Sequence, residues 1–186
     1  MFVEYSKNKN GFTLVELLVA VSVIGLLSSI IYASFGESRE QARDRARMSS
    51  LKQLQLSIEQ YRAQNGSYPV AGCGALTSEF AGPGPSTILG FVSCSPLASL
   101  SYVSSVTPDY IDVLPRDVAF EVESNRGYYY RSDGNSYKLM AYDVVENLFV
   151  TDFTHEFARC PAATGACASG VPATTYAVYS RGAEDW

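Results

Sequence analysis

The feature that most constrains this chain is an apolar run near its start. Residues 12–35 read FTLVELLVAVSVIGLLSSIIYASF and hold one charged side chain, that of Glu16. As an α-helix the run would be about 36 Å long, at about 1.5 Å per residue, which exceeds the roughly 30 Å core of a bilayer. A secretory signal peptide has an apolar run of only about 7–15 residues and a small-residue cleavage site. The run therefore predicts a membrane-spanning helix and not a secretory signal.

The carboxylate of Glu16 does not suit a simple anchor. An acidic side chain near the centre of a membrane helix costs about 2.5–3.5 kcal/mol on insertion scales, and less near the interface. Such a residue is a functional hypothesis by default. The alternative is a glutamate close to the interface that extends its side chain to the headgroups.

The residues around Glu16 form a specific motif. The string GFTLVELL at residues 11–18, after a short leader with Lys7 and Lys9, resembles the processing site of type IV prepilins and type II secretion pseudopilins. The resemblance implies that a prepilin peptidase cuts between Gly11 and Phe12 and methylates the new amino terminus of Phe12. It also implies that Glu16 pairs with the Phe12 ammonium of a neighbouring subunit and sets the register in a filament. Pairing within one chain is the alternative.

The residues after the apolar run predict a continuation of the helix. Residues 37–65 are rich in helix formers and contain no Pro or Gly. Glu40 with Arg43, and Asp44 with Arg47, are opposite charges at i, i+3 spacing. A helical apolar stripe indicates the face that packs on a head; it consists of Leu51, Leu54, Ile58 and Tyr61.

We therefore expect one helix from about residue 12 to residue 65. Many members of the resembled family carry a proline in the apolar half of this helix, and residues 31–33 have none. Gly25 is the one weak point in that half. Either it allows close packing of helices, or the helix melts there during assembly.

The rest of the chain predicts a β-rich head. Residues 128–131 and 137–141 flank Ser-Asp-Gly-Asn at 132–135, which is a hairpin signal. Further strands are expected at 148–153 and 175–180. Most of the 13 tyrosines fall in these strands, where packing across the sheet explains them. The predicted fold class is α+β and pilin-like: a three- or four-stranded antiparallel sheet on the second half of the helix.

The head contains all four cysteines. Their simplest pairing joins Cys73 to Cys94 and Cys160 to Cys167, although four cysteines allow three connectivities. The wide spacing argues against zinc. Disulfides favour an oxidising compartment and hence a head outside the cytoplasm.

The charges that flank the apolar run point to the opposite orientation. The arginines at 39–47, on the far side of the run, would by the positive-inside rule leave the head in the cytoplasm. The motif implies a leader in the cytoplasm, and the cysteines favour an oxidising compartment. For these two reasons we expect the head to be exported.

Other function classes find little support. A net charge of −5 argues against a general nucleic-acid binder, and a single histidine argues against a His-based metal site or triad. No phosphate loop or nucleophile elbow occurs, so we expect no enzyme. We expect no cofactor either. Some pseudopilins bind calcium in a C-terminal loop, but Glu184 and Asp185 do not form a convincing ligand set.

These patterns predict four segments: a cytoplasmic leader at 1–11 that is removed, a membrane or filament-core half of the helix at 12–35, its extracytoplasmic half at 36–66, and the head at 67–186. The predicted function is that of a structural subunit of a type IV pilus-like filament. A type II secretion pseudopilin and a minor or tip subunit that binds a surface or DNA are the alternatives. The expected partners are a prepilin peptidase and methyltransferase, like subunits and an inner-membrane assembly platform. The expected location is the inner membrane, then a periplasmic or extracellular filament.

Overall fold

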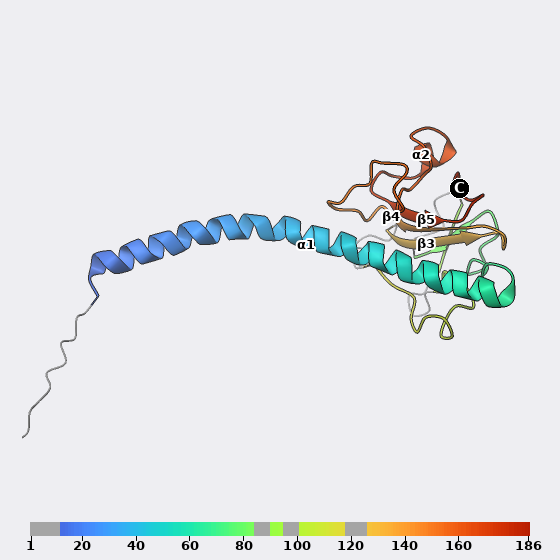
Figure 1. Cartoon of the computed structure of the whole chain (residues 1–186), viewed down its shortest axis with the longest axis horizontal. Coiled ribbons are helices and arrows are strands. Elements are labelled where there is room, and N and C mark those ends of the chain that lie inside the picture. Colours follow the sequence, from blue (N-terminus) through green and yellow to red (C-terminus); the bar gives the residue numbers. More distant parts are fainter. Residues whose placement is uncertain (1–11, 84–89, 95–100, 118–125) are drawn as a thin grey trace, which may run out of the picture. The chain divides into compact units, whose positions relative to one another are not determined.

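The computed structural model describes residues 12–83, 90–94, 101–117 and 126–186. The chain divides into two compact units, Met1–Arg39 and Glu40–Trp186, which are described separately below. Helix α1, Leu14–Asn65, contributes residues to both units (Figure 1). The predicted long helix is therefore confirmed, with its first residue two positions later than expected.

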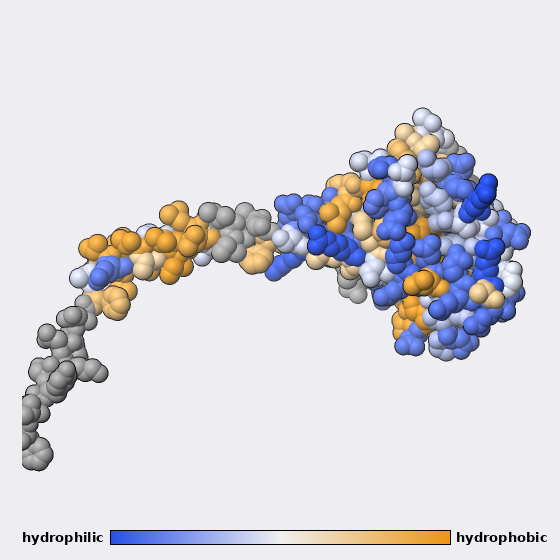
Figure 2. All heavy atoms as spheres, in the orientation of Figure 1, coloured by the Kyte–Doolittle hydropathy of each residue, from blue (hydrophilic) through white to orange (hydrophobic). Residues whose placement is uncertain are grey.

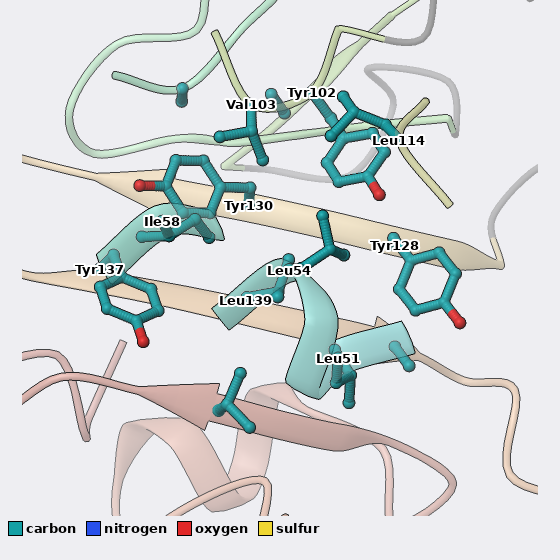
Figure 3. Packing of buried hydrophobic residues seen from close by; sticks show 14 of the residues in the cluster. Leu51, Leu54, Ile58, Tyr102, Val103, Leu114, Tyr128, Tyr130, Tyr137 and Leu139 are labelled. Carbon is teal, nitrogen blue, oxygen red and sulfur yellow. The ribbon is translucent and has the colours of Figure 1, made fainter. Parts of the chain in front are cut away.

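Within the second unit, the predicted apolar stripe of α1 forms one side of the core. Leu51, Leu54 and Ile58 are fully buried, and Tyr61 packs at the edge of the same cluster. Figure 3 shows these helix side chains facing tyrosine and leucine side chains of the sheet. Burying an aliphatic side chain contributes about 1.5–3 kcal/mol, so this stripe is a major link between helix and head.

The head is built on a five-stranded sheet in the order β2-β1-β3-β4-β5. One short helix, α2, precedes the last strand. The element bounds are β1 Phe80–Gly82, β2 Phe91–Ser93, β3 Gly127–Ser132, β4 Tyr137–Tyr142, α2 Ala166–Gly170 and β5 Tyr176–Tyr179. The α+β class is as predicted.

The hairpin of β3 and β4 is also as predicted. Tyr130 lies opposite Leu139 in the antiparallel register. The Asp133 carboxylate accepts the N–H groups of Asn135 and Ser136, and Gly134 has a positive φ of 88°. The Asp-Gly signal therefore marks the connection because glycine adopts this backbone conformation without strain.

Two predictions about the sheet were wrong. Within the described residues the sheet has five strands, and it is mixed, because β1 and β2 pair in parallel with Phe80 opposite Phe91. The expected strand at 148–153 does not form. A side chain of α1, Asp44, accepts the backbone N–H of Leu148, so that group is not available to a strand ladder.

The two faces of the sheet carry separate cores. One face packs on α1, and the other carries a smaller cluster that includes Phe80, Tyr129 and Met140. Disulfide Cys160–Cys167 belongs to the smaller cluster, and disulfide Cys73–Cys94 closes the loop that contains β1 and β2. This is the simplest pairing that the sequence offers.

Candidate functional site

Among the described side chains of the first unit, the large apolar ones are exposed. Figure 2 shows hydrophobic side chains gathered along the N-terminal half of α1. Their exposure is high: Phe12 is 83% exposed and Ile24 is 63% exposed. Patches of this kind in proteins mark contacts with other proteins or with membranes. The exposed large side chains are Phe12, Leu14, Val15, Leu17, Leu18, Val19, Val21, Val23, Ile24, Leu26, Leu27 and Phe35.

Glu16 lies in the first turn of this helix and binds Thr13. Its Oε2 accepts hydrogen bonds from the backbone N–H and the Oγ1 hydroxyl of Thr13, both at 2.8 Å. In return the Glu16 N–H donates to Thr13 Oγ1 at 3.2 Å. This reciprocal arrangement is a capping box, which satisfies N–H groups that a helix start leaves unpaired. The sequence carries the T-x-x-E signal of this box at residues 13–16, and the box was not among the predictions.

Two further residues of the N-terminal segment, Gly11 and Gly25, were predicted to be functional. Gly11, and with it the predicted cleavage bond, lies outside the described residues. Gly25 lies within continuous α-helix, and a Cβ atom added there would meet nothing within 4 Å. In the part of the chain that the structure describes, no helix is both long and apolar enough to cross a membrane.

A buried charge cluster joins α1 to the head in the second unit. The Asp44 carboxylate accepts the backbone N–H groups of Glu146, Asn147 and Leu148, the last two at 2.8 and 2.9 Å. Arg47 Nη1 also donates to Asp44 Oδ1 at 2.8 Å. Both side chains are almost fully buried. The predicted pair of Asp44 and Arg47 therefore forms, and it lies in the core of the second unit.

The acceptors around Arg47 come from distant parts of the chain. Arg47 Nε donates to Asp117 Oδ2 at 2.7 Å, and Nη1 donates to Glu146 Oε1 at 2.8 Å. Arg43 binds Glu146 too, whereas the sequence had paired it with Glu40. Only the tertiary structure brings these charges together, since residues 117 and 146 lie far from α1 in sequence.

These contacts shift the pKa values of the cluster. The hydrogen bond from Arg43, supported by Arg47, lowers the pKa of Glu146 to about 2. Burial alone would lower the pKa of Arg47, but the hydrogen bonds from Arg47 to Asp117, Glu146 and Asp44 outweigh it and raise the pKa. Arg47 and Glu146 are thus held in their charged forms near neutral pH, as a structural anchor requires.

The described side chains do not form a metal centre. Within residues 12–83, 90–94, 101–117 and 126–186, no three His, Cys, Asp or Glu side chains are grouped so that they could hold a metal ion. Glu184 and Asp185 are the two acids near the C-terminal end that were weighed as calcium ligands. The Glu184 carboxylate accepts the N–H of Gly182 at 2.6 Å. Asp185 lines a cleft on the sheet.

Comparisons with known proteins agree with the motif. Residues 6–32 match the family described as the prokaryotic N-terminal methylation motif. The chain is similar to proteins named type II secretion system core protein G. It is 28% identical to that of Dickeya chrysanthemi over 75 residues, which are 39% of this chain and 49% of the relative. The Vibrio cholerae protein is 27% identical over 81 residues, 42% of this chain and 56% of the relative. The Klebsiella pneumoniae protein is 30% identical over 74 residues, 39% and 53% of the two chains.

The chain thus spans about half the length of the curated relatives it matches. No solved structure matches the chain significantly. The matched motif and these relatives support the type IV pilin and pseudopilin family for this chain.

Proposed function

We propose that this chain is a structural subunit of a type IV pilus-like filament. It is made as a prepilin, cleaved between Gly11 and Phe12 and methylated at Phe12. The observation that carries the proposal is the methylation motif at the start of a helix whose apolar side chains are exposed. In a filament, the apolar segment at 12–35 would pack with its counterparts in other subunits, and the head would face outward.

The second candidate is a type II secretion pseudopilin. It is favoured by the relatives, which are all named as core protein G of that secretion system. The two functions share the same chemistry of processing and assembly. Both imply a precursor anchored in the inner membrane by residues 12–35, with the head outside the cytoplasm, where the two disulfides would be stable.

Glu16 has two roles in this proposal, helix capping and charge pairing. In the precursor its carboxylate caps the helix through Thr13. After cleavage it would also attract the Phe12 ammonium of a neighbouring subunit, because each charge is costly in an apolar filament core and the pair offsets that cost. The two roles can be separated by substitution.

Glu16→Gln and Thr13→Ala make this separation. Glutamine serves in a capping box, so Glu16→Gln keeps the cap and removes only the charge. Thr13→Ala removes the cap and keeps the charge. We expect both precursors to insert and to be cleaved, and we expect sheared filaments from Thr13→Ala but not from Glu16→Gln. Normal filaments from Glu16→Gln would refute the charge pair.

Intact mass spectrometry of the protein from its own membranes tests processing. A mature chain that starts at Phe12, heavier by one CH2 (a methyl group in place of a hydrogen) and lighter by four hydrogens than the bare sequence, supports cleavage, methylation and two disulfides together. A chain that keeps its leader and has four free thiols would overturn the filament proposal.

A further inference from the structure

The face of the sheet away from α1 is hollowed by a cleft that filament assembly does not explain. Its volume is about 450 Å³, within the range of small-molecule sites in proteins, which is about 300–1,000 Å³. Figure 1 shows α2 and the C-terminal end on this side of the sheet. The residues that line the cleft include Phe80, Phe91, Arg131, Met140, Asp185 and Trp186.

The walls of this cleft are fixed by buried contacts. Lys138, fully buried in β4, donates from Nζ to the backbone oxygens of Trp186 and Glu184 at 2.7 and 3.1 Å. This holds the C-terminal segment against the sheet. On the other side, disulfide Cys160–Cys167 restrains the loop that carries α2. A cleft between two tethered segments is preformed, so a ligand would spend little free energy on ordering it.

Among the described residues that line the cleft, Arg131 is the basic side chain, and it is held in place without forming an ion pair. Its guanidinium carbon lies 4.0 Å from the ring centre of Trp186 and 5.7 Å from that of Phe80. Its Nε donates to the backbone oxygen of Thr77 at 2.9 Å. Among the described residues its two terminal nitrogens have no hydrogen-bond acceptor, and no carboxylate forms an ion pair with it.

A partly buried guanidinium with free donors is complementary to an anion. Burial lowers the pKa of Arg131, and the charge of Asp133 offsets only part of this effect. A planar carboxylate matches the guanidinium fork through two parallel hydrogen bonds. Asp185, at the rim, would repel a dianion such as phosphate more strongly than a monocarboxylate. The aromatic side chains favour a flat body next to the charge.

We propose that this cleft binds a small organic monocarboxylate, with its carboxylate on Arg131 and its flat body against Phe80, Phe91 and Trp186. The site is a property of the head and does not depend on the kind of filament. A flat body is supplied by an aromatic ring or by a sugar ring, so aromatic acids and sugar acids are the two sources of this chemistry.

The cleft contains its own reporter. Trp186 is the only tryptophan of the chain, so its fluorescence reports directly on this site. The experiment titrates the full-length protein in a non-ionic detergent with benzoate and, separately, with glucuronate. Benzamide has nearly the same shape as benzoate without its charge and serves as the matched ligand control. We expect a saturable change with at least one acid and, where benzoate binds, a benzamide affinity at least tenfold weaker than that of benzoate.

Two arginine variants complete the test. Arg131→Gln should weaken binding of the acid at least tenfold, whereas Arg181→Gln, an exposed arginine of the same unit, should leave it unchanged. A response to benzoate alone identifies an aromatic acid, and a response to glucuronate alone identifies a sugar acid. The proposal is overturned if neither acid alters the fluorescence up to about 10 mM, or if benzamide binds as well as benzoate. The second comparison uses the unmodified chain and so does not depend on the folding of a variant.

Discussion

The contact of Asp44 with the segment at 146–148 should be among the most sensitive points of the head. Its carboxylate accepts four hydrogen bonds, from three successive backbone N–H groups and from Arg47. Asp44→Ala would leave the three partly buried N–H groups without this acceptor, and the buried Arg47 with only Asp117 and Glu146. A hydrogen bond to a charged group contributes about 1.5–3 kcal/mol, and removal of one partner of a buried ion pair costs about 3–5 kcal/mol.

We expect Asp44→Ala to lower the free energy of unfolding by about 3–5 kcal/mol, because the four bonds are not additive and opening of the segment lets water replace some of them. Asp44→Asn keeps one acceptor oxygen and should cost less, about 1–3 kcal/mol. The matched control is Asp112→Ala. Asp112 is exposed in the same unit, so its loss should change stability by less than about 0.5 kcal/mol.

Equilibrium urea unfolding of the full-length chain, followed by the near-UV signal of the buried tyrosines, measures the loss. Amide hydrogen exchange gives a local reading, since the amides of Glu146, Asn147 and Leu148 should lose protection in Asp44→Ala and keep it in Asp112→Ala. The anchor is refuted if the two variants are equally stable, or if these three amides stay protected without the Asp44 carboxylate.

Three further predictions concern pH, the disulfides and the helix. Because the pKa of Glu146 is lowered from 4.5 to about 2, its contribution to stability is complete above pH 4.5 and is lost as the pH falls toward 2. Glu146→Gln should therefore flatten this part of a plot of melting temperature against pH, and an unchanged slope would contradict the assignment. Reduction of both disulfides should lower the free energy of unfolding by about 2–5 kcal/mol for each bridge, with the longer loop contributing more, and should therefore lower the melting temperature. An unchanged melting temperature after reduction would show that the disulfides do not stabilise the head. Gly25→Ala should stabilise the helix of the first unit by about 1 kcal/mol, since alanine has the higher helix propensity and the new methyl group meets nothing within 4 Å. Unchanged filament yield from Gly25→Ala would remove that glycine from the functional residues.

The sequence alone determined the features that depend on residues close together in the chain. The apolar run with its single glutamate, the stripe at Leu51, Leu54 and Ile58, and the Asp-Gly hairpin all depend on local spacing. Local spacing fixes which face of a helix is apolar and where a hairpin turns, so the long helix and the β3–β4 pair could be predicted. The methylation motif is equally local, which is why the functional proposal begins in the sequence.

Features that join distant residues were decided only by the tertiary structure. The strands β1 and β2 have three residues each and no periodicity, so their parallel pairing depends on the sheet beside them. The sequence paired Asp44 with Arg47 alone, but the fold buries Asp44, and its carboxylate also takes the N–H group of Leu148, with which the expected strand at 148–153 would have begun. The cleft at Arg131 likewise exists only because the C-terminal segment folds back over the sheet. The physical reason is the same in each case: which polar groups are buried, and which partner satisfies them, depends on contacts that no local pattern of residues records.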